Sequence, residues 1–317
     1  MDAYEGPGRA APEEAAACSS APMFPESAAC AERPFDILRP EGGEPGRPPC
    51  PLVFASPHSG RCYPPALMAQ SVLDEATIRR SEDALVDRLI AGAPAFGAVC
   101  LSARYARAYV DLNREPYELD PAMFEDELPP FARARRSPRV AAGLGSIARV
   151  VGEGQEIYRG KLRFDDARRR IETIHRPYHQ ALTELVDQAR AAHGVSILID
   201  WHSMPSAPGG TTAGRRVCDI VLGDRFGSAC SPRLIRLVEG ALEGMGYRVA
   251  RNTPYAGGYT TEFYGRPERG SHALQVEISR SLYLDESSLQ PNAGFERLKR
   301  DLDRLCQTLA RDWRKTI

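Results

Sequence analysis

The chain lacks the patterns that direct a protein to nucleic acid or to a membrane. Lys and Arg number 41 against 42 Asp and Glu, which leaves a formal charge of −1 and no general attraction to polyanions. No apolar run approaches the roughly 18 residues that a membrane span needs. The N-terminus also lacks the basic segment and apolar core of a secretory signal. We therefore expect neither a nucleic-acid partner nor a membrane partner.

The cysteines lack a pattern as well. The eight of them are scattered, with no Cys-x-x-Cys pair, which predicts neither a disulfide framework nor a thiolate zinc site. We interpret Cys62, although it lies close to His58 in sequence, as a buried and inert thiol. A reduced, cytoplasmic compartment fits these observations.

Several catalytic motifs are absent too. The sequence contains no Gly-x-Ser-x-Gly elbow, no His-Glu-x-x-His and no Gly-x-x-x-x-Gly-Lys-Ser/Thr. The sequence therefore does not support assignment to the serine hydrolases, the zincins or the P-loop proteins.

The composition and the apolar pattern along the chain predict an N-terminal tail followed by one folded domain. Residues 1–34 are rich in Ala, Pro, Glu, Gly and Ser, which predicts a disordered, low-complexity tail. From Leu52 onward, apolar runs alternate with helical patterns, so residues 35–317 are expected to form a single α/β domain with a mixed, largely parallel sheet. Strands are predicted near 52–55, 98–102, 108–112, 196–201, 217–222, 247–250 and 272–279, and helices near 74–90, 165–193, 231–245 and 295–314. Residues 115–160 form a long loop region, interpreted as a lid over the site.

Two histidines follow or end predicted buried strands. His58 lies in a Pro-His-Ser-Gly segment, and His202 lies in Asp-Trp-His-Ser, where Asp200 is placed to accept a hydrogen bond from its ring. Either histidine alone is readily explained as structural. Together, at the carboxyl ends of strands where open α/β folds bind ligands, they favour a metal site.

The third ligand is expected from the helix that follows the first strand. Zinc commonly takes two nitrogens and one carboxylate, and Glu82 and Asp83 both qualify. Helical geometry turns Glu82 toward the apolar stripe and leaves Asp83 at its edge, so spacing does not choose between them. The alternative is a solvated acidic start of a helix.

Glu277 lies within an apolar strand, where an ionised carboxylate is costly unless it is paired or exposed in a crevice. Near zinc it would act as the base that deprotonates water, and the alternative is a structural salt bridge with Arg280 or another arginine. Arg114 closes another strand and suits a substrate carboxylate or an oxyanion, or else a surface ion pair.

A turn-rich segment contains glycines that would allow a ligand close to the backbone, although it could equally be a tight loop. Its residues of interest are Asn252, Tyr255, Gly257, Gly258 and Tyr259. His175 and His179 are one helical turn apart, but without a Glu between them as in His-Glu-x-x-His we interpret the pair as packing or outer-shell groups.

In this order, these segments resemble the N-formylglutamate amidohydrolase family. The matching segments are 56–60, Asp83 with 86–89, 111–114, 177–179, 200–203, 219–223, Asn252 with 257–260, 264–265 and 272–283. The resemblance covers about residues 50–285. It implies a three-layer α/β/α sandwich similar to zinc-dependent exopeptidases and amidases.

The resemblance also implies roles for individual residues. His58, Asp83 and His202 would hold Zn²⁺ or another first-row divalent metal, which settles the choice that helix geometry left open. Glu277 would be the general acid and base. Arg114 would bind a carboxylate or the oxyanion, and Arg215 and Arg280 are further candidates for the substrate's carboxylates. Asn252, Gly258 and Tyr259 would contribute to substrate binding.

The resulting hypothesis is a cytoplasmic, metal-dependent amidohydrolase that acts on a small N-acyl amino acid. N-formyl-L-glutamate is the leading substrate, with formate and L-glutamate as products, as in histidine degradation. The segment after Arg114 and the long tail resemble a divergent branch. The alternatives are a zinc amidase or exopeptidase with another N-acyl or peptide substrate, and a non-catalytic metal-binding relative.

Overall fold

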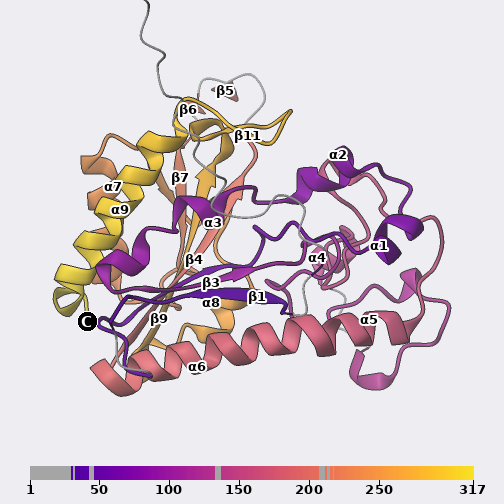
Figure 1. Ribbon diagram of the computed structural model, residues 1–317, viewed down its shortest axis with the longest axis horizontal. Coiled ribbons are helices and arrows are strands. Elements are labelled where there is room, and N and C mark those ends of the chain that lie inside the picture. The colour runs from indigo at the N-terminus through magenta and orange to yellow at the C-terminus, as the bar shows by residue number, and fades with distance from the viewer. Residues whose placement is uncertain are drawn as a thin grey trace, which may run out of the picture.

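A seven-stranded sheet forms the centre of the protein (Figure 1). The computed structural model describes residues 30, 33–42, 46–132, 137–206, 211–212, 215–216 and 218–317. The strands, in spatial order, are β1 (Phe35–Leu38), β3 (Val99–Ala103), β2 (Leu52–Ser56), β4 (Ser196–Met204), β9 (Ser271–Ser279), β7 (Ile220–Gly223) and β8 (Val249–Arg251). The four strands from β3 to β9 are parallel, whereas β1 and β7 run antiparallel to their inner neighbours. The predicted mixed, largely parallel sheet is confirmed.

Helices cover both faces of this sheet. The long helix α6 (Arg176–His193) crosses one face, and α7 (Pro232–Gly244) and α9 (Phe295–Asp312) lie against the other (Figure 1). Alternate residues of each strand point to opposite faces, so Val53 packs toward α6 while Phe54 packs toward α9. The result is the predicted three-layer α/β/α arrangement.

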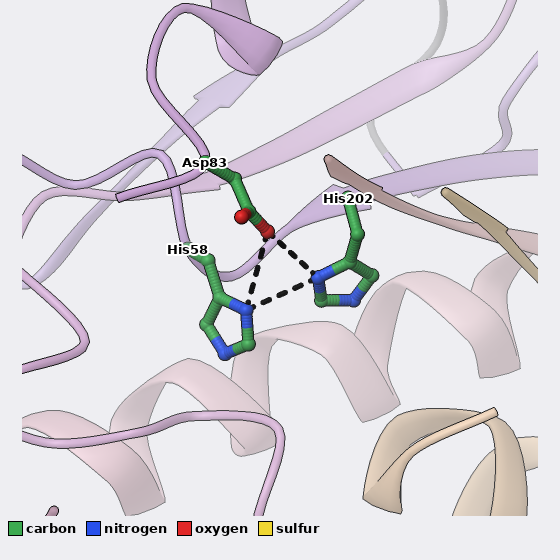
Figure 2. Close-up of side chains that lie close together, drawn as sticks. All are labelled: His58, Asp83 and His202. Carbon is green, nitrogen blue, oxygen red and sulfur yellow. Dashed lines mark hydrogen bonds and ion pairs between the residues drawn. The ribbon is translucent and has the colours of Figure 1, made fainter. Parts of the chain in front are cut away.

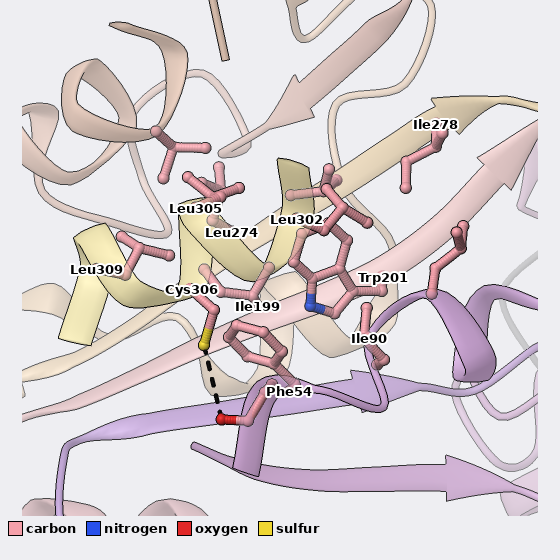
Figure 3. Packing of buried hydrophobic residues seen from close by; sticks show 14 of the residues in the cluster. Phe54, Ile90, Ile199, Trp201, Leu274, Ile278, Leu302, Leu305, Cys306 and Leu309 are labelled. Carbon is pink, nitrogen blue, oxygen red and sulfur yellow. Dashed lines mark hydrogen bonds between the residues drawn. The ribbon is translucent and has the colours of Figure 1, made fainter. Parts of the chain in front are cut away.

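The core on the α9 side is built from large apolar side chains (Figure 3). Trp201 is fully buried, and its ring meets Phe54 edge to face with ring centroids 5.4 Å apart. Leu302 and Leu305 of α9 belong to the same cluster. Since burial of such a side chain contributes about 1.5–3 kcal/mol, this layer is a main source of stability.

The smaller elements connect these layers. Among the smaller helices are α1 (Pro65–Gln70), α4 (Pro138–Ala141), α5 (Phe164–Arg170) and α8 (Tyr259–Tyr264). The short strands pair as β5 (Thr211–Thr212) with β6 (Arg215–Arg216) and β10 (Leu284–Asp285) with β11 (Gln290–Pro291). Helices α5 and α6 join through a π-helical turn at Ile171–His175, so the predicted helix over 165–193 is confirmed as one continuous rod. In the described part of 115–160, the only helices are α4 and single 3₁₀ turns, as expected of a loop region.

The single helix predicted over 74–90 is wrong. The structure has α2 (Glu75–Ile78), a 3₁₀ turn (Arg79–Ser81) and α3 (Val86–Leu89), with an extended Glu82 and a left-handed Leu85 at φ 63° between them. The backbone N–H of Asp83 donates to the carbonyl of His58 at 3.0 Å instead of to a helical partner. A bond to the loop after β2 thus replaces the helical pattern and moves Asp83 toward His58.

One predicted strand is absent from the structure, and one observed strand was not predicted. The run at 108–112 is a turn and irregular segment rather than a strand. Strand β1 was not predicted, because it is a four-residue edge strand that directly follows the tail.

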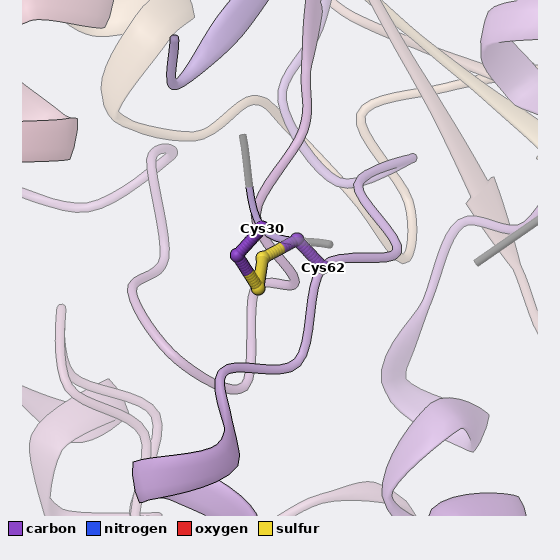
Figure 4. The surroundings of a disulfide bond; sticks show 2 residues. All are labelled: Cys30 and Cys62. Carbon is purple, nitrogen blue, oxygen red and sulfur yellow. A yellow bond between two sulfur atoms is a disulfide. The ribbon is translucent and has the colours of Figure 1, made fainter. Parts of the chain in front are cut away.

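The prediction that Cys62 is a free thiol is also wrong. Cys62 forms a disulfide with Cys30, with Cα atoms 5.3 Å apart and a sequence separation of 32 (Figure 4). Spacing along the chain cannot reveal that two distant Cα atoms lie within bridging distance. The tail predicted over 1–34 lies outside the described residues, apart from Cys30 and residues 33–34.

No helix in the described part of the chain is long and apolar enough to cross a membrane.

Candidate metal centre

The predicted metal and acid–base residues meet where the strand order changes direction. From β2 the chain continues to β3 on one side, whereas β4 lies on the other side, which makes the gap between β2 and β4 a topological switch point. His58 lies just beyond the end of β2, and His202 lies near the carboxyl end of β4. Glu277 of β9 is the direct register partner of His202. The edge at which open α/β sheets bind ligands therefore carries all three side chains.

His58, Asp83 and His202 point toward one another (Figure 2). The two Nδ1 atoms of the histidines are 3.1 Å apart, and Oδ2 of Asp83 lies 3.0 Å from His202 Nδ1 and 3.3 Å from His58 Nδ1. One ligand atom from each residue lies within 4.8 Å of the others, and all three side chains are buried. The structure thus brings together the three predicted ligands from three separate segments.

The outer faces of both imidazoles are held by carboxylates. His58 Nε2 lies 2.7 Å from Asp111 Oδ1, and His202 Nε2 lies 3.0 Å from Asp200 Oδ2. The Asp200 partner was predicted, whereas Asp111 had been assigned no role. Since a carboxylate accepts, each Nε2 donates its proton outward, and each Nδ1 can offer its lone pair once a bound cation has displaced the proton shared with Asp83. Two lone pairs and a carboxylate oxygen that converge in this way fit a divalent cation.

The electrostatics of the cluster also favour positive charge at this point. Burial acts to raise the pKa of Asp83, but hydrogen bonds from His202 and His58 outweigh it and hold that pKa well below 3.8. Burial acts to lower the pKa of His202, but Asp200 and Asp83 raise it well above 6.5. In the absence of metal, the cluster therefore keeps a proton that a bound cation must displace.

Asp83, not Glu82, joins the histidines. Glu82 Oε1 instead accepts hydrogen bonds from Tyr63 Oη and Arg79 Nε, both at 2.9 Å. The second oxygen of Asp83 lies 3.3 Å from Arg280 Nη2, which also donates to the Glu82 carbonyl at 2.6 Å. Arg280, predicted as a substrate-binding residue, is thus placed against the segment that presents Asp83.

Glu277 lies beside the cluster without an ion pair among the described residues. Its Oε1 accepts a hydrogen bond from Gln275 Nε2 at 2.7 Å, and the residue is only 7% exposed. Burial raises the pKa of Glu277 to about 7, with His202 opposing and Asp83 assisting the shift. A carboxyl group that can hold or release a proton near neutral pH suits acid–base chemistry.

Besides Arg280, two more arginines adjoin the site, and of these the sequence pointed only to Arg114. Arg114 donates from Nε to the Leu144 carbonyl and from Nη1 to the Asn113 carbonyl, each at 2.9 Å. Arg107, which was missed, donates to Asp111 Oδ2 at 2.7 Å and has a side chain that is 22% exposed.

The charge of Arg107 acts on the centre of the site. Burial acts to lower the pKa of Arg107, but the charges of Asp111, Asp83 and Glu277 raise it. Nothing in the local sequence distinguishes this arginine from its neighbours, because only the fold brings it near these carboxylates.

The turn-rich segment reaches the site at Gly258. The N–H of Gly258 donates to Gln275 Oε1 at 2.8 Å, and a Cβ on this glycine would lie 2.4 Å from Asn113 Nδ2. Close packing against Asn113 therefore requires a glycine. Asn252, by contrast, bonds to Asp224 through its own side chain at 2.7 Å, which stabilises the neighbouring loop.

The two tyrosines of this segment have different surroundings. The Tyr259 ring packs edge-on against His179 with centroids 5.2 Å apart. Tyr255 is 38% exposed, and its pKa is raised by burial and then by the charge of Glu277, which places it near the rim of the site. The side chain of Arg215, another predicted carboxylate partner, lies outside the described residues.

Fold and site together define an α/β protein with an imidazole–carboxylate cluster, able to hold a metal ion, at the carboxyl edge of its sheet. The sequence profile of the N-formylglutamate amidohydrolase family matches residues 50–284. The chain belongs to this family and is a hydrolase that acts on amide C–N bonds, as the resemblance implied.

Individual relatives agree with this assignment. The N-formylglutamate deformylase of Pseudomonas aeruginosa is 30% identical over 241 residues, which are 75% of this chain and 84% of that protein. The deformylase of Pseudomonas putida is 29% identical over 240 residues, 75% of this chain and 83% of its own. The crystal structure of N-formylglutamate amidohydrolase from Ralstonia eutropha JMP134 has a TM-score of 0.82 at 37% identity, and covers 90% of this chain and 99% of that one.

Proposed function

We propose that this protein is a zinc-dependent deformylase that hydrolyses N-formyl-L-glutamate to formate and L-glutamate. The family and the two Pseudomonas relatives support the reaction class and this substrate. The observation that carries the metal-dependent mechanism is the convergence of two imidazoles and a carboxylate beside Glu277.

His58, Asp83 and His202 are the residues that would hold the cation. Two nitrogens and one carboxylate form a common donor set for catalytic zinc, and another first-row divalent metal is the alternative. A divalent cation in such a site supplies Lewis acidity toward a carbonyl oxygen and lowers the pKa of water toward neutrality.

Glu277 is proposed as the general base and then the general acid. In the first step its carboxylate takes a proton from the attacking water as the new C–O bond forms at the formyl carbon. In the second step it returns that proton to the amide nitrogen as the C–N bond breaks, which releases formate and the free amine of glutamate. The pKa of about 7 suits both directions of proton transfer.

Arginine side chains are proposed to stabilise the negative charge of the substrate. Arg107 bonds to Asp111, and its charge interacts with those of Asp83 and Glu277, so it is proposed to stabilise the developing oxyanion. Arg114, whose guanidinium is oriented by two backbone carbonyls, is proposed to bind a substrate carboxylate. Arg280 stays a candidate for the second carboxylate, although its hydrogen bonds connect it to Asp83 and to the Glu82 carbonyl.

The turn-rich segment is proposed to line the substrate site. Gly258 and Tyr259 adjoin Asn113, and Asn252 contributes by fixing the loop on which they are carried. A cytoplasmic location and a role in histidine degradation stay predictions. The disulfide weakens the argument for the location that came from the cysteine pattern.

Formate release separates this proposal from its alternatives. Metal-free protein reconstituted with Zn²⁺ is assayed on N-formyl-L-glutamate, N-formyl-L-glutamine, N-formyl-L-aspartate and N-acetyl-L-glutamate. We expect kcat/KM for N-formyl-L-glutamate to exceed that for each of the others at least tenfold. For N-formyl-L-glutamine the reason is the loss of one charge-assisted contact, which costs about that much. Faster release of acetate would indicate an amidase for another acyl group, and no turnover with any substrate would indicate a non-catalytic relative.

A further inference from the structure

The long helix α6 and the π turn before it carry two buried histidines outside the metal cluster. His175 and His179 are 1% and 9% exposed, and their ring centroids are 4.4 Å apart. The proposed reaction uses neither of them. Buried imidazoles are uncommon without a polar partner, because each ring has two nitrogens to satisfy.

Both imidazoles bond to the same short stretch of backbone. His175 Nε2 lies 2.8 Å from the carbonyl oxygen of Arg114, and His179 Nε2 lies 2.7 Å from that of Leu112. A carbonyl oxygen only accepts, so both Nε2 atoms carry a proton and donate it. The two histidines therefore hydrogen-bond to alternate carbonyls of residues 111–114, a segment that belongs to no helix or strand.

The Leu112 carbonyl sets the tautomer of His179, with the proton on Nε2 and a lone pair on Nδ1. Tyr264 Oη lies 3.0 Å from that Nδ1 and also donates to the His179 carbonyl at 3.0 Å, so two acceptors share its one proton. Thr183 Oγ1 donates to the same carbonyl at 2.8 Å. Burial lowers the pKa of His175 to about 4 and that of His179 to about 3, so both rings are neutral at pH 7.

Side chains of residues 111–114 contact both proposed metal-binding histidines. Asp111 Oδ1 accepts from His58 Nε2 at 2.7 Å. Asn113 Nδ2 lies 3.1 Å from His202 Nε2 and 3.4 Å from Asp200 Oδ2, the partner of His202, while its Oδ1 accepts from the N–H of Thr260 at 2.8 Å. Residues 111–114 thus carry the groups that lie behind the two imidazoles of the cluster.

We propose that His175 and His179 are positioning residues of the metal centre, which act through the backbone of residues 111–114. They hold the carbonyls of Leu112 and Arg114, and so keep Asp111 and Asn113 aligned behind the two ligating histidines. Groups that orient metal-ligating imidazoles typically change metal affinity 10- to 100-fold when they are removed. This inference rests on the metal site of the proposed function.

The same helix supplies a matched control. His193 Nε2 lies 2.7 Å from the carbonyl of Pro48, in the chain that precedes β2. This is the same imidazole-to-carbonyl bond from the same helix, at the end of α6 away from residues 111–114. A merely structural role for such bonds predicts similar behaviour at all three histidines.

The test is metal affinity, measured without turnover. Metal-free full-length protein and the variants His175→Leu, His179→Leu and His193→Leu are titrated with Co²⁺, followed by visible absorption, and with Zn²⁺ in competition. We expect Kd to rise about tenfold or more for the first two variants and less than twofold for His193→Leu. Equal affinity in the parent and in all three variants would overturn the inference and leave the metal site intact.

Two milder sets of variants keep the test decisive should the leucine variants fail to fold. Tyr264→Phe removes the hydroxyl that contacts His179 at Nδ1 and at its carbonyl, and a roughly threefold or larger rise in Kd is expected. His175→Gln and His179→Gln retain an N–H donor and are expected to recover most of the affinity lost in the leucine variants. Parent-like affinity in Tyr264→Phe, with gross loss in the glutamine variants, would indicate packing alone. A parent protein that binds neither Co²⁺ nor Zn²⁺ would overturn the proposed metal site and this inference with it.

Discussion

The two faces of strands β4 and β9 are equally buried but carry opposite chemistry. Toward α9 the strands present apolar side chains, namely Ile199, Trp201, Leu274, Val276 and Ile278. Toward α6 the alternate positions near the carboxyl ends are polar, namely Asp200, His202, Gln275 and Glu277, none more than 7% exposed.

This difference shows how one pair of strands serves both as core and as site. The pleat sends successive side chains to opposite faces, so Glu277 and Ile278 are chain neighbours in different environments. The apolar face stabilises the fold through burial. The polar face retains its charged groups because the outer nitrogen of each imidazole in the cluster has a carboxylate partner. Substitutions on one face should therefore change the reaction, and those on the other should change the free energy of unfolding.

Glu277→Gln should give the largest effect. Without a group that takes and returns a proton, kcat is expected to fall about 10³-fold, while the amide conserves the shape of the side chain. Kinetics on N-formyl-L-glutamate, metal content and urea unfolding check this, and Glu262→Gln, at an exposed position, is the matched control. A kcat within tenfold of the parent would remove Glu277 from the proposed mechanism.

Separate replacement of Arg107 and Arg114 tests which of them stabilises the oxyanion and which binds a substrate carboxylate. Arg107→Met is expected to lower kcat about 10²-fold, since loss of one oxyanion donor typically costs that much. Arg114→Met is expected mainly to raise KM, because its proposed partner is a substrate carboxylate in the ground state as well as in the transition state. The opposite pattern would exchange the two roles. Arg107→Lys, which retains the charge beside Asp111, separates the loss of charge from the loss of geometry.

Ile278→Val should give the smallest effect and lies on the apolar face. Removal of one buried methyl group is expected to lower the free energy of unfolding by about 0.5–1.5 kcal/mol and to leave kcat per folded molecule unchanged. Urea unfolding and initial rates on the same preparation measure both quantities. If kcat fell severalfold while stability stayed constant, the two faces could not be treated as independent.

The sequence was most informative where a polar residue ends an apolar strand. His58, His202 and Glu277 were found in this way, and the structure brings them together. The buried strands and the long helices were predicted because burial leaves a pattern in the sequence. A strand buried on both faces is a continuous apolar run, and a helix buried on one face has apolar residues every three or four positions. The choice of Asp83 over Glu82 came from the family resemblance.

The remaining features depend on contacts between distant parts of the chain. The helix predicted over 74–90 breaks because the N–H of Asp83 bonds to His58, and no local pattern contains that bond. Arg107 becomes a candidate only when the fold places its charge near Asp83 and Glu277. The three-layer architecture was likewise implied by the resemblance, because apolar runs alone do not determine the order of the strands.

The Cys30–Cys62 bridge makes the choice of reductant an experimental variable. Cys62 lies four positions after His58, so opening the bridge would release a covalent anchor beside a proposed zinc ligand. Dithiols that open such bridges also compete for soft and borderline cations. A thiol-treated preparation could thus lose activity for either of two unrelated reasons, which a phosphine reductant with added Zn²⁺ would separate.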